Sequence, residues 1–141
     1  KVRSLGYAVK LDTNGANPEK LRSLIEKGLI DYVAMDIKNC KEKYELTAGA
    51  EVSLSDIQKS IDILLSSGVD YEFRTTVVEG YHTVQDIKKI AEWIKGADKY
   101  FIQNFVDSGD IISENCAQVD QNTLEEMLHT AISCGINAKI R

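Results

Sequence analysis

The sequence has few of the residues that mark linkers, disulfide frameworks or membrane anchors. Its 141 residues include 1 proline and 3 cysteines, and Cys40, Cys116 and Cys134 form no C-x-x-C pair. Neither a disulfide framework nor a closed metal site is therefore expected. The longest apolar runs are far shorter than the ~20 residues that cross a bilayer, and we expect no signal peptide. We predict no membrane partner and a cytoplasmic location.

The sequence also lacks a basic stripe. Lys and Arg number 17 against 22 Asp and Glu, which gives a net charge of -5 at pH 7. Sequence-independent nucleic-acid binding depends on clustered Lys and Arg that displace counterions, so no nucleic-acid partner is predicted. With 43% hydrophobic residues, a chain of this length can bury one core and leaves little for a second. Residues 1–141 are expected to form a single domain.

Five strand-like runs alternate with helix-like runs along the chain. A shorter helical turn is expected near residues 41–46, and cap signals open three of the helices: Asn17 before Pro18, Thr83 with Asp86, and Asn122 with Glu125. Repeated strand–helix–strand units predict right-handed crossovers and a parallel sheet, so the fold class is α/β. The strands are expected near residues 7–11, 32–37, 71–77, 100–104 and 136–140.

The predicted strands have one polar and one apolar face. Parallel strands that helices cover on both faces read as nearly continuous apolar runs, and these strands do not. We therefore predict a partial TIM-like (β/α) barrel fragment with about five strands, rather than an open doubly wound sheet. Its polar inner face would line a ligand site. Taken at period two, that face carries Lys10, Asp12, Ala34, Asp36, Lys38, Glu72, Arg74, Thr76 and Gln103.

Charged side chains of both signs are expected to meet where these strands end. Asp36 and Lys38 are two residues apart and share one face of a strand. Asp12 and Arg74 belong to the neighbouring strands, and barrel active sites gather at the carboxyl ends of strands. Carboxylates hold a cation, an ammonium or a hydroxyl, whereas Lys and Arg hold a carboxylate or phosphate. The cluster suits a zwitterionic ligand, and an ion-pair network that satisfies a buried polar face is the alternative.

The two histidines are not predicted to carry chemistry. His82 follows Gly80 in a loop at the same end of the sheet. We expect it to be an exposed loop residue rather than an acid or base. His129 lies among charged residues of a helix and is expected on its solvated surface.

Three motifs together carry a resemblance to a known family. They are Leu11–Gly15 (LDTNG), Asp31–Lys38 (DYVAMDIK) and Phe73–Gly80 (FRTTVVEG). In this order, at strand ends, they resemble the radical S-adenosylmethionine enzymes that activate glycyl-radical enzymes, such as anaerobic ribonucleotide reductase and pyruvate formate-lyase. The resemblance covers nearly the whole chain and implies the back portion of a partial (β/α) barrel.

The resemblance also implies a cofactor and a set of binding residues. In this family a [4Fe-4S] cluster on a C-x-x-x-C-x-x-C loop binds S-adenosylmethionine. The 5′-deoxyadenosyl radical formed from it abstracts a hydrogen from a glycine of the partner enzyme. A monovalent cation site is implied at Asp12, Thr13, the Ala34 backbone and Asp36. The predicted cofactor-binding residues are Thr13, Asn14, Asp36, Lys38 and Arg74, together with Gln103 and Asn104 on a strand that lacks the His some relatives place there.

The printed residues depart from the family pattern at the cluster. They contain neither the C-x-x-x-C-x-x-C motif nor the Gly-Gly-Glu stretch that binds the amino group of S-adenosylmethionine, and they begin with Lys1. We interpret the chain as the carboxyl-terminal portion of an activase, inactive by itself and binding neither cofactor. The full-length parent would act on a glycyl-radical enzyme. Two alternatives are a stand-alone domain that binds a small zwitterion or phosphate, and a (β/α)-barrel metabolic enzyme that uses Lys38 as a base or Schiff-base amine.

A partial barrel leaves its first strand with an unpaired edge, which another chain can extend. We expect the 141-residue chain to self-associate or to be poorly soluble unless the edge near residues 7–11 is covered. Size-exclusion chromatography with light scattering at several concentrations measures this. A monodisperse monomer in dilute solution would contradict the prediction.

Overall fold

The structure is a computed structural model that describes residues 3–106 and 116–141. One sheet runs through it, with the strand order β1-β2-β3-β4-β5 and parallel pairing throughout. A doubly wound sheet would reverse its order at a switch point, whereas this order follows the chain without a reversal. The predicted parallel (β/α) partial barrel is confirmed. Its strands are β1 (Lys10–Thr13), β2 (Tyr32–Asp36), β3 (Asp70–Val77), β4 (Tyr100–Asn104) and β5 (Ala138–Ile140).

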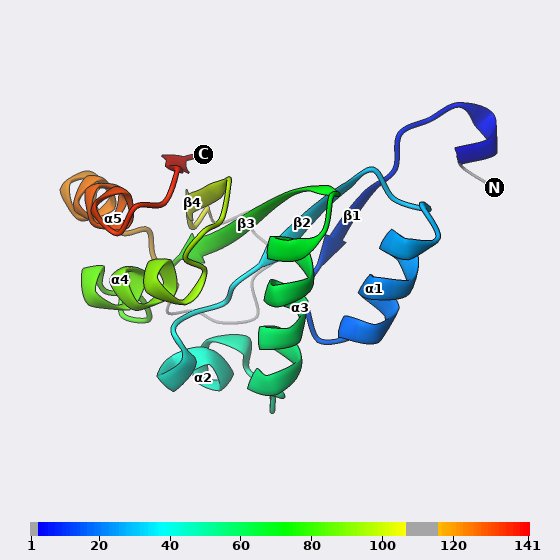
Figure 1. Cartoon of the computed structure of the whole chain (residues 1–141). Coiled ribbons are helices and arrows are strands. Elements are labelled where there is room, and N and C mark those ends of the chain that lie inside the picture. The colour runs from blue at the N-terminus through cyan, green and yellow to red at the C-terminus, as the bar shows by residue number, and fades with distance from the viewer. Residues whose placement is uncertain (1–2, 107–115) are drawn as a thin grey trace.

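The helices gather on one face of this sheet (Figure 1). Right-handed crossovers between strands in sequential order place every connecting helix on the same side. α1 packs against α3, and α4 packs against α5. The helices are α1 (Pro18–Glu26), α2 (Tyr44–Ala48), α3 (Leu54–Ser66), α4 (Val84–Trp93) and α5 (Gln121–Ser133), with short 3-10 turns η1 (Arg3–Leu5) and η2 (Lys41–Lys43). In the part of the chain that the structure describes, no helix is long and apolar enough to span a membrane.

The hydrophobic core lies between the sheet and these helices. The strands contribute fully buried side chains such as Val33, Met35 and Phe73, and the helices contribute others such as Ile61 and Ile90. The opposite face of the sheet carries the charged residues of the strands. The predicted division into a polar and an apolar face is therefore confirmed, and the polar face is the one that the helices leave uncovered.

Most element boundaries agree with the sequence, and the differences have local causes. β1 begins at Lys10 rather than near residue 7, because the Val9 N–H donates to the Asp31 carboxylate (2.8 Å) instead of entering a ladder. The caps at Asn17 and Thr83 are confirmed, the second as a full capping box. The cap expected at Asn122 is wrong. Asp120 caps α5 instead, since its carboxylate accepts from Thr123 N at 3.0 Å.

Gly15 joins β1 to the loop before α1 at a position that excludes other residues. Its φ is +76°, a conformation that side-chain-bearing residues avoid. A Cβ added there would lie 2.1 Å from the terminal methyl of Met35, which is fully buried in the core. The Gly15 carbonyl also accepts from the buried Ser60 hydroxyl at 2.7 Å. Gly15 therefore lets the end of β1 approach β2 and α3 closely.

We expect Gly15→Ala to lower the free energy of unfolding by about 1 to 3 kcal/mol, because the positive φ is strained and Met35 must move. Urea unfolding followed by circular dichroism measures the change. Gly68→Ala is the matched control, since Gly68 has ordinary φ and no atom within 4 Å of an added Cβ. The control should change stability by less than about 0.5 kcal/mol. Equal losses in the two variants would contradict this account.

Candidate functional site

Arg74 links three strands at the carboxyl end of the sheet. Its Nη2 and Nε contact the same oxygen, Asp36 Oδ1, at 2.8 and 2.9 Å. Its Nη1 lies 2.9 Å from Asp12 Oδ1. Asp36 is the direct neighbour of Arg74 in the ladder, while Asp12 faces Ala34. The guanidinium therefore crosses β2 beside Ala34, whose small side chain leaves room for it. The structure brings Asp12, Asp36 and Arg74 together as the sequence predicts.

Lys38 completes the mixed-charge cluster. Its ammonium lies 3.2 Å from Asp36 Oδ2, so Asp36 contacts Arg74 with one oxygen and Lys38 with the other. The Lys38 side chain is 41% exposed and the Asp12 side chain is 60% exposed, so both can reach a ligand in solution. We call Asp12, Asp36, Lys38 and Arg74 the strand-end cluster.

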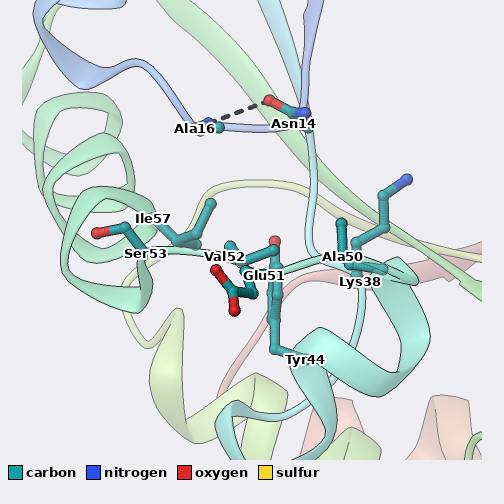
Figure 2. Close-up of a pocket in the computed structure, with 10 residues that line it drawn as sticks. Asn14, Ala16, Lys38, Tyr44, Ala50, Glu51, Val52, Ser53 and Ile57 are labelled. Carbon is teal, nitrogen blue, oxygen red and sulfur yellow. Dashed lines mark hydrogen bonds between the residues drawn. The ribbon is translucent and has the colours of Figure 1, made fainter.

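Two cavities meet at Lys38. The larger, of about 250 Å³, extends from Lys38 toward Asn14, Tyr44 and Glu51. Figure 2 shows Asn14 above the segment with Glu51 and Ser53, which precedes α3, and Lys38 at the right. The smaller, of about 180 Å³, lies between the ends of β2 and β3 and is lined by Asp36, Ile37, Lys38, Thr47, Arg74, Thr76 and Val78.

Thr13 and Asn14 fold the loop that follows β1. The Thr13 hydroxyl accepts from Gly15 N at 3.1 Å, and Asn14 Oδ1 accepts from Ala16 N at 3.1 Å (Figure 2). Such bonds to the backbone two residues on are typical of tight turns. Asn14 thereby lines the larger cavity, whereas the Thr13 oxygen is used within the loop.

Gln103 and Asn104 lie on β4, and neither lines these two cavities. Gln103 is paired with Thr76 on the polar face. Both polar groups of the Asn104 side chain bind Val119, with Nδ2 donating to its carbonyl at 2.9 Å and Oδ1 accepting from its N–H at 3.1 Å. Asn104 thus anchors the segment before α5, and its predicted role in cofactor binding stays a prediction.

Of the residues implied for a monovalent cation, Asp12 and Asp36 lie close together because both contact Arg74. Both Asp12 and Asp36 already accept from its guanidinium. Residues 3–106 and 116–141 contain no group of three or more His, Cys, Asp or Glu arranged for a metal ion. A cation at Asp12, Thr13, Ala34 and Asp36 would have to share these carboxylates with Arg74, and it stays a prediction.

A second charged cluster lies nearer the amino ends of the strands, around Glu72. Arg141 donates to both carboxylate oxygens, at 2.8 and 3.1 Å, the Tyr32 hydroxyl donates at 2.8 Å, and Lys10 lies 3.6 Å away. Burial alone would raise the pKa of Glu72, but the bonds from Arg141 and Tyr32 outweigh it and hold the pKa at about 2. Burial and the bond to Glu72 raise the pKa of Tyr32 to about 12. We call Glu72, Arg141, Tyr32 and Lys10 the floor cluster.

His82 corrects an expectation from the sequence. It is only 4% exposed rather than a solvated loop residue. Its Nδ1 accepts from Val78 N at 3.1 Å, and its Nε2 lies 2.8 Å from the Lys38 carbonyl. Burial lowers the pKa of His82 below its usual value. No periodicity marks this position, because the ring is buried by a loop rather than by a helix or strand face. His129 is exposed as expected.

The comparisons with known proteins point to the class of protein that the motifs resemble. The chain is 39% identical over 109 residues to a curated protein of Methanocaldococcus jannaschii named "Putative glycyl-radical enzyme activating enzyme". That alignment covers 74% of this chain and 45% of the relative, so the chain spans about half the length of the curated relative that it matches. No family model matches the chain.

A solved structure has the same fold. The chain matches a crystal structure of a domain of pyruvate-formate lyase-activating enzyme from Bacteroides vulgatus with a TM-score of 0.77. The match covers 99% of this chain and 84% of that chain at 16% sequence identity, which shows the fold alone. The chain is therefore similar in sequence to part of one glycyl-radical enzyme activating enzyme and similar in fold to a domain of another activating enzyme.

The floor cluster generates a prediction about acid stability. The pKa of Glu72 is about 2 in the folded chain, and its usual value is 4.5. Between pH 4.5 and about 2, Glu72 is therefore protonated in the unfolded chain and ionised in the folded chain. The contribution of Glu72 to the free energy of unfolding should fall by at most about 3 kcal/mol as the pH drops through this range. Urea unfolding at several pH values measures the slope.

Glu72→Gln should make the slope between pH 4.5 and about 2 less steep, since it removes one of the carboxyl groups that titrate there. Glu26→Gln, on the exposed surface of α1, is the matched control and should keep the parent slope. If Glu72→Gln follows the same pH dependence as the parent chain, the floor cluster does not control acid stability.

Proposed function

We propose that this chain forms one wall of the S-adenosylmethionine site of a glycyl-radical enzyme activase. The strand-end cluster carries the proposal, because it presents both signs of charge at the carboxyl ends of adjacent barrel strands. The relationship to glycyl-radical enzyme activating enzymes supports it. The natural protein that carries this sequence would act on a glycyl-radical enzyme as its protein partner.

The donor set of the cluster fits S-adenosylmethionine. The ligand is a zwitterion with ribose hydroxyls, so it needs a cation for its carboxylate and acceptors for its hydroxyls. Lys38 is exposed and supplies the cation, while Asp36 supplies acceptor oxygens. When bound, S-adenosylmethionine supplies the 5′-deoxyadenosyl group with which this class of enzyme abstracts hydrogen.

In this proposal the residues of the strand-end cluster orient the ligand and balance its charge. Arg74 is 18% exposed and makes three short contacts to Asp36 and Asp12, which hold both carboxylates beside its guanidinium. A carboxylate ligand would bring a negative charge next to Lys38, whose ammonium pairs with Asp36. Lys38 can turn from Asp36 to the ligand while Arg74 keeps Asp36 neutralised.

The iron–sulfur cluster does not fit the described residues. They contain no group of three or more His, Cys, Asp or Glu suited to a metal, and the printed sequence has no C-x-x-x-C-x-x-C motif. We therefore assign no step of cluster chemistry to these residues and propose that the 141 residues alone are inactive. The single-domain organisation and the cytoplasmic location remain predictions.

A binding domain without chemistry is the second candidate. The two cavities that share Lys38 favour it, since they would accept a small zwitterion or a phosphate. The use of Lys38 as a Schiff-base amine is less well supported. Such lysines are activated by a desolvated pocket, whereas Lys38 is 41% exposed and paired with Asp36.

The proposal is tested with the natural protein that carries this sequence, prepared without oxygen and reduced with dithionite. We expect it to bind S-adenosylmethionine and to release methionine and 5′-deoxyadenosine, which liquid chromatography detects. Lys38→Met should weaken binding about ten- to hundredfold, since it removes a charge-assisted contact to the ligand carboxylate. Isothermal titration calorimetry measures the affinity.

Lys59→Met is the matched control, because Lys59 is an exposed lysine on α3 that pairs with Asp56. It should bind S-adenosylmethionine as the parent does. Equal affinities of the Lys38 and Lys59 variants would contradict the binding site, and a parent protein that forms no 5′-deoxyadenosine would contradict the activase.

A further inference from the structure

β2 and β3 stop pairing directly beside the strand-end cluster. Their register ends where Asp36 faces Arg74, followed by a bond from Ile37 N to the Arg74 carbonyl at 2.8 Å. The Thr75 hydroxyl then donates to the Ile37 carbonyl at 2.9 Å. Past this point the smaller cavity opens between the chain at Lys38 and the end of β3.

The imidazole of His82 joins the two chain segments that border this cavity, one at Lys38 and the other at Val78. It joins the Lys38 carbonyl at one nitrogen, 2.8 Å away, and the Val78 N–H at the other, 3.1 Å away. Since a backbone N–H can only donate, Nδ1 must be unprotonated, and Nε2 then carries the proton that it donates to the carbonyl. The ring is therefore neutral, which agrees with its burial. The ring therefore links the Lys38 carbonyl to the Val78 N–H.

Asn39 makes a second bridge across the same two segments. Its side chain is fully buried, and Nδ2 donates to the Tyr81 carbonyl at 3.1 Å and to the Thr47 hydroxyl at 2.9 Å. Its Oδ1 accepts from Cys40 N at 2.7 Å. The chain at residues 38–40 is thus held to residues 78–82 by side chains rather than by a strand ladder.

We propose that His82 is a positioning residue for the ligand site, which keeps the smaller cavity open and holds the backbone of Lys38 where its ammonium can reach the ligand. It acts on the backbone of Lys38 and not on the ligand. Without the bond to Nε2, the Lys38 carbonyl loses its fixed partner and the ammonium beyond it loses its direction. This inference rests on the proposed function, because it concerns the affinity of the same site for S-adenosylmethionine.

Two conservative variants separate the two bonds of the ring. In His82→Asn the short amide can accept from Val78 N–H, but it does not extend to the Lys38 carbonyl. In His82→Gln the longer amide can place its N–H₂ group near the position of Nε2. We expect His82→Asn to weaken S-adenosylmethionine binding about five- to tenfold, the loss of one neutral hydrogen bond, and His82→Gln to recover most of it. Calorimetry on the natural protein that carries this sequence measures both affinities, and thermal melts check the fold.

A double-mutant cycle with Lys38→Met distinguishes positioning from general destabilisation. If His82 acts through Lys38, the double variant His82→Asn/Lys38→Met should bind no more weakly than Lys38→Met alone. Additive losses would overturn the inference, and so would equal losses in the Asn and Gln variants. Should His82→Asn fail to fold, His82→Gln decides alone, because a loss of affinity as large as that of Lys38→Met would also overturn it.

The result also separates this inference from the proposed function. Unchanged affinity in His82→Asn together with weakened affinity in Lys38→Met would overturn only the positioning role. Unchanged affinity in both variants would overturn the ligand site itself. Nitrogen-15 spectra of the imidazole give a readout that is independent of activity. A ring protonated at Nδ1, or at both nitrogens, would contradict the bond from Val78.

Discussion

A sheet that is covered by helices on one face must satisfy the polar groups of its other face by itself. Here the parallel strands follow in sequential order, so their connections all lie on one side. The uncovered face is paired internally, and no buried side-chain nitrogen or oxygen of the described residues lacks a partner. The ion pairs of Arg74 and of Glu72 are how this face is satisfied.

The floor cluster and the strand-end cluster both pair the charged groups of that face, but they differ in how far those groups are exposed. In the floor cluster, Glu72 is 2% exposed and its oxygens are occupied by Arg141 and Tyr32, with Lys10 close by. A saturated and buried carboxylate stabilises the fold but has nothing left to bind. The strand-end cluster keeps a carboxylate and an ammonium exposed, at Asp12 and Lys38. Charged groups that can exchange a protein partner for a ligand are found at the carboxyl ends of the strands, where barrel sites form.

The loops at this end are held by side chains because the strands no longer pair. His82 and Asn39 connect the chain after β2 to the chain after β3, and Thr13 and Asn14 fold the turn after β1. These bonds satisfy backbone groups of Lys38, Tyr81, Gly15 and Ala16, which lie past the ends of the strands. The cavities can exist because these side chains hold the loops apart without filling the space between the strand ends.

The sequence by itself determined the class of fold and the members of the strand-end cluster. Period-two alternation in residues 32–38 and 71–77 is a local property, and it assigned Asp36, Lys38 and Arg74 to one face before any contact was known. Only the tertiary structure decided what each residue contacts. Asp120 caps α5 where Asn122 was expected to, and Asn104 binds the backbone of Val119. His82 is buried and bonds to the Lys38 carbonyl. These contacts depend on which loops lie next to each other in the folded chain. The pattern of apolar and polar residues does not show that residues 38 and 82 are neighbours.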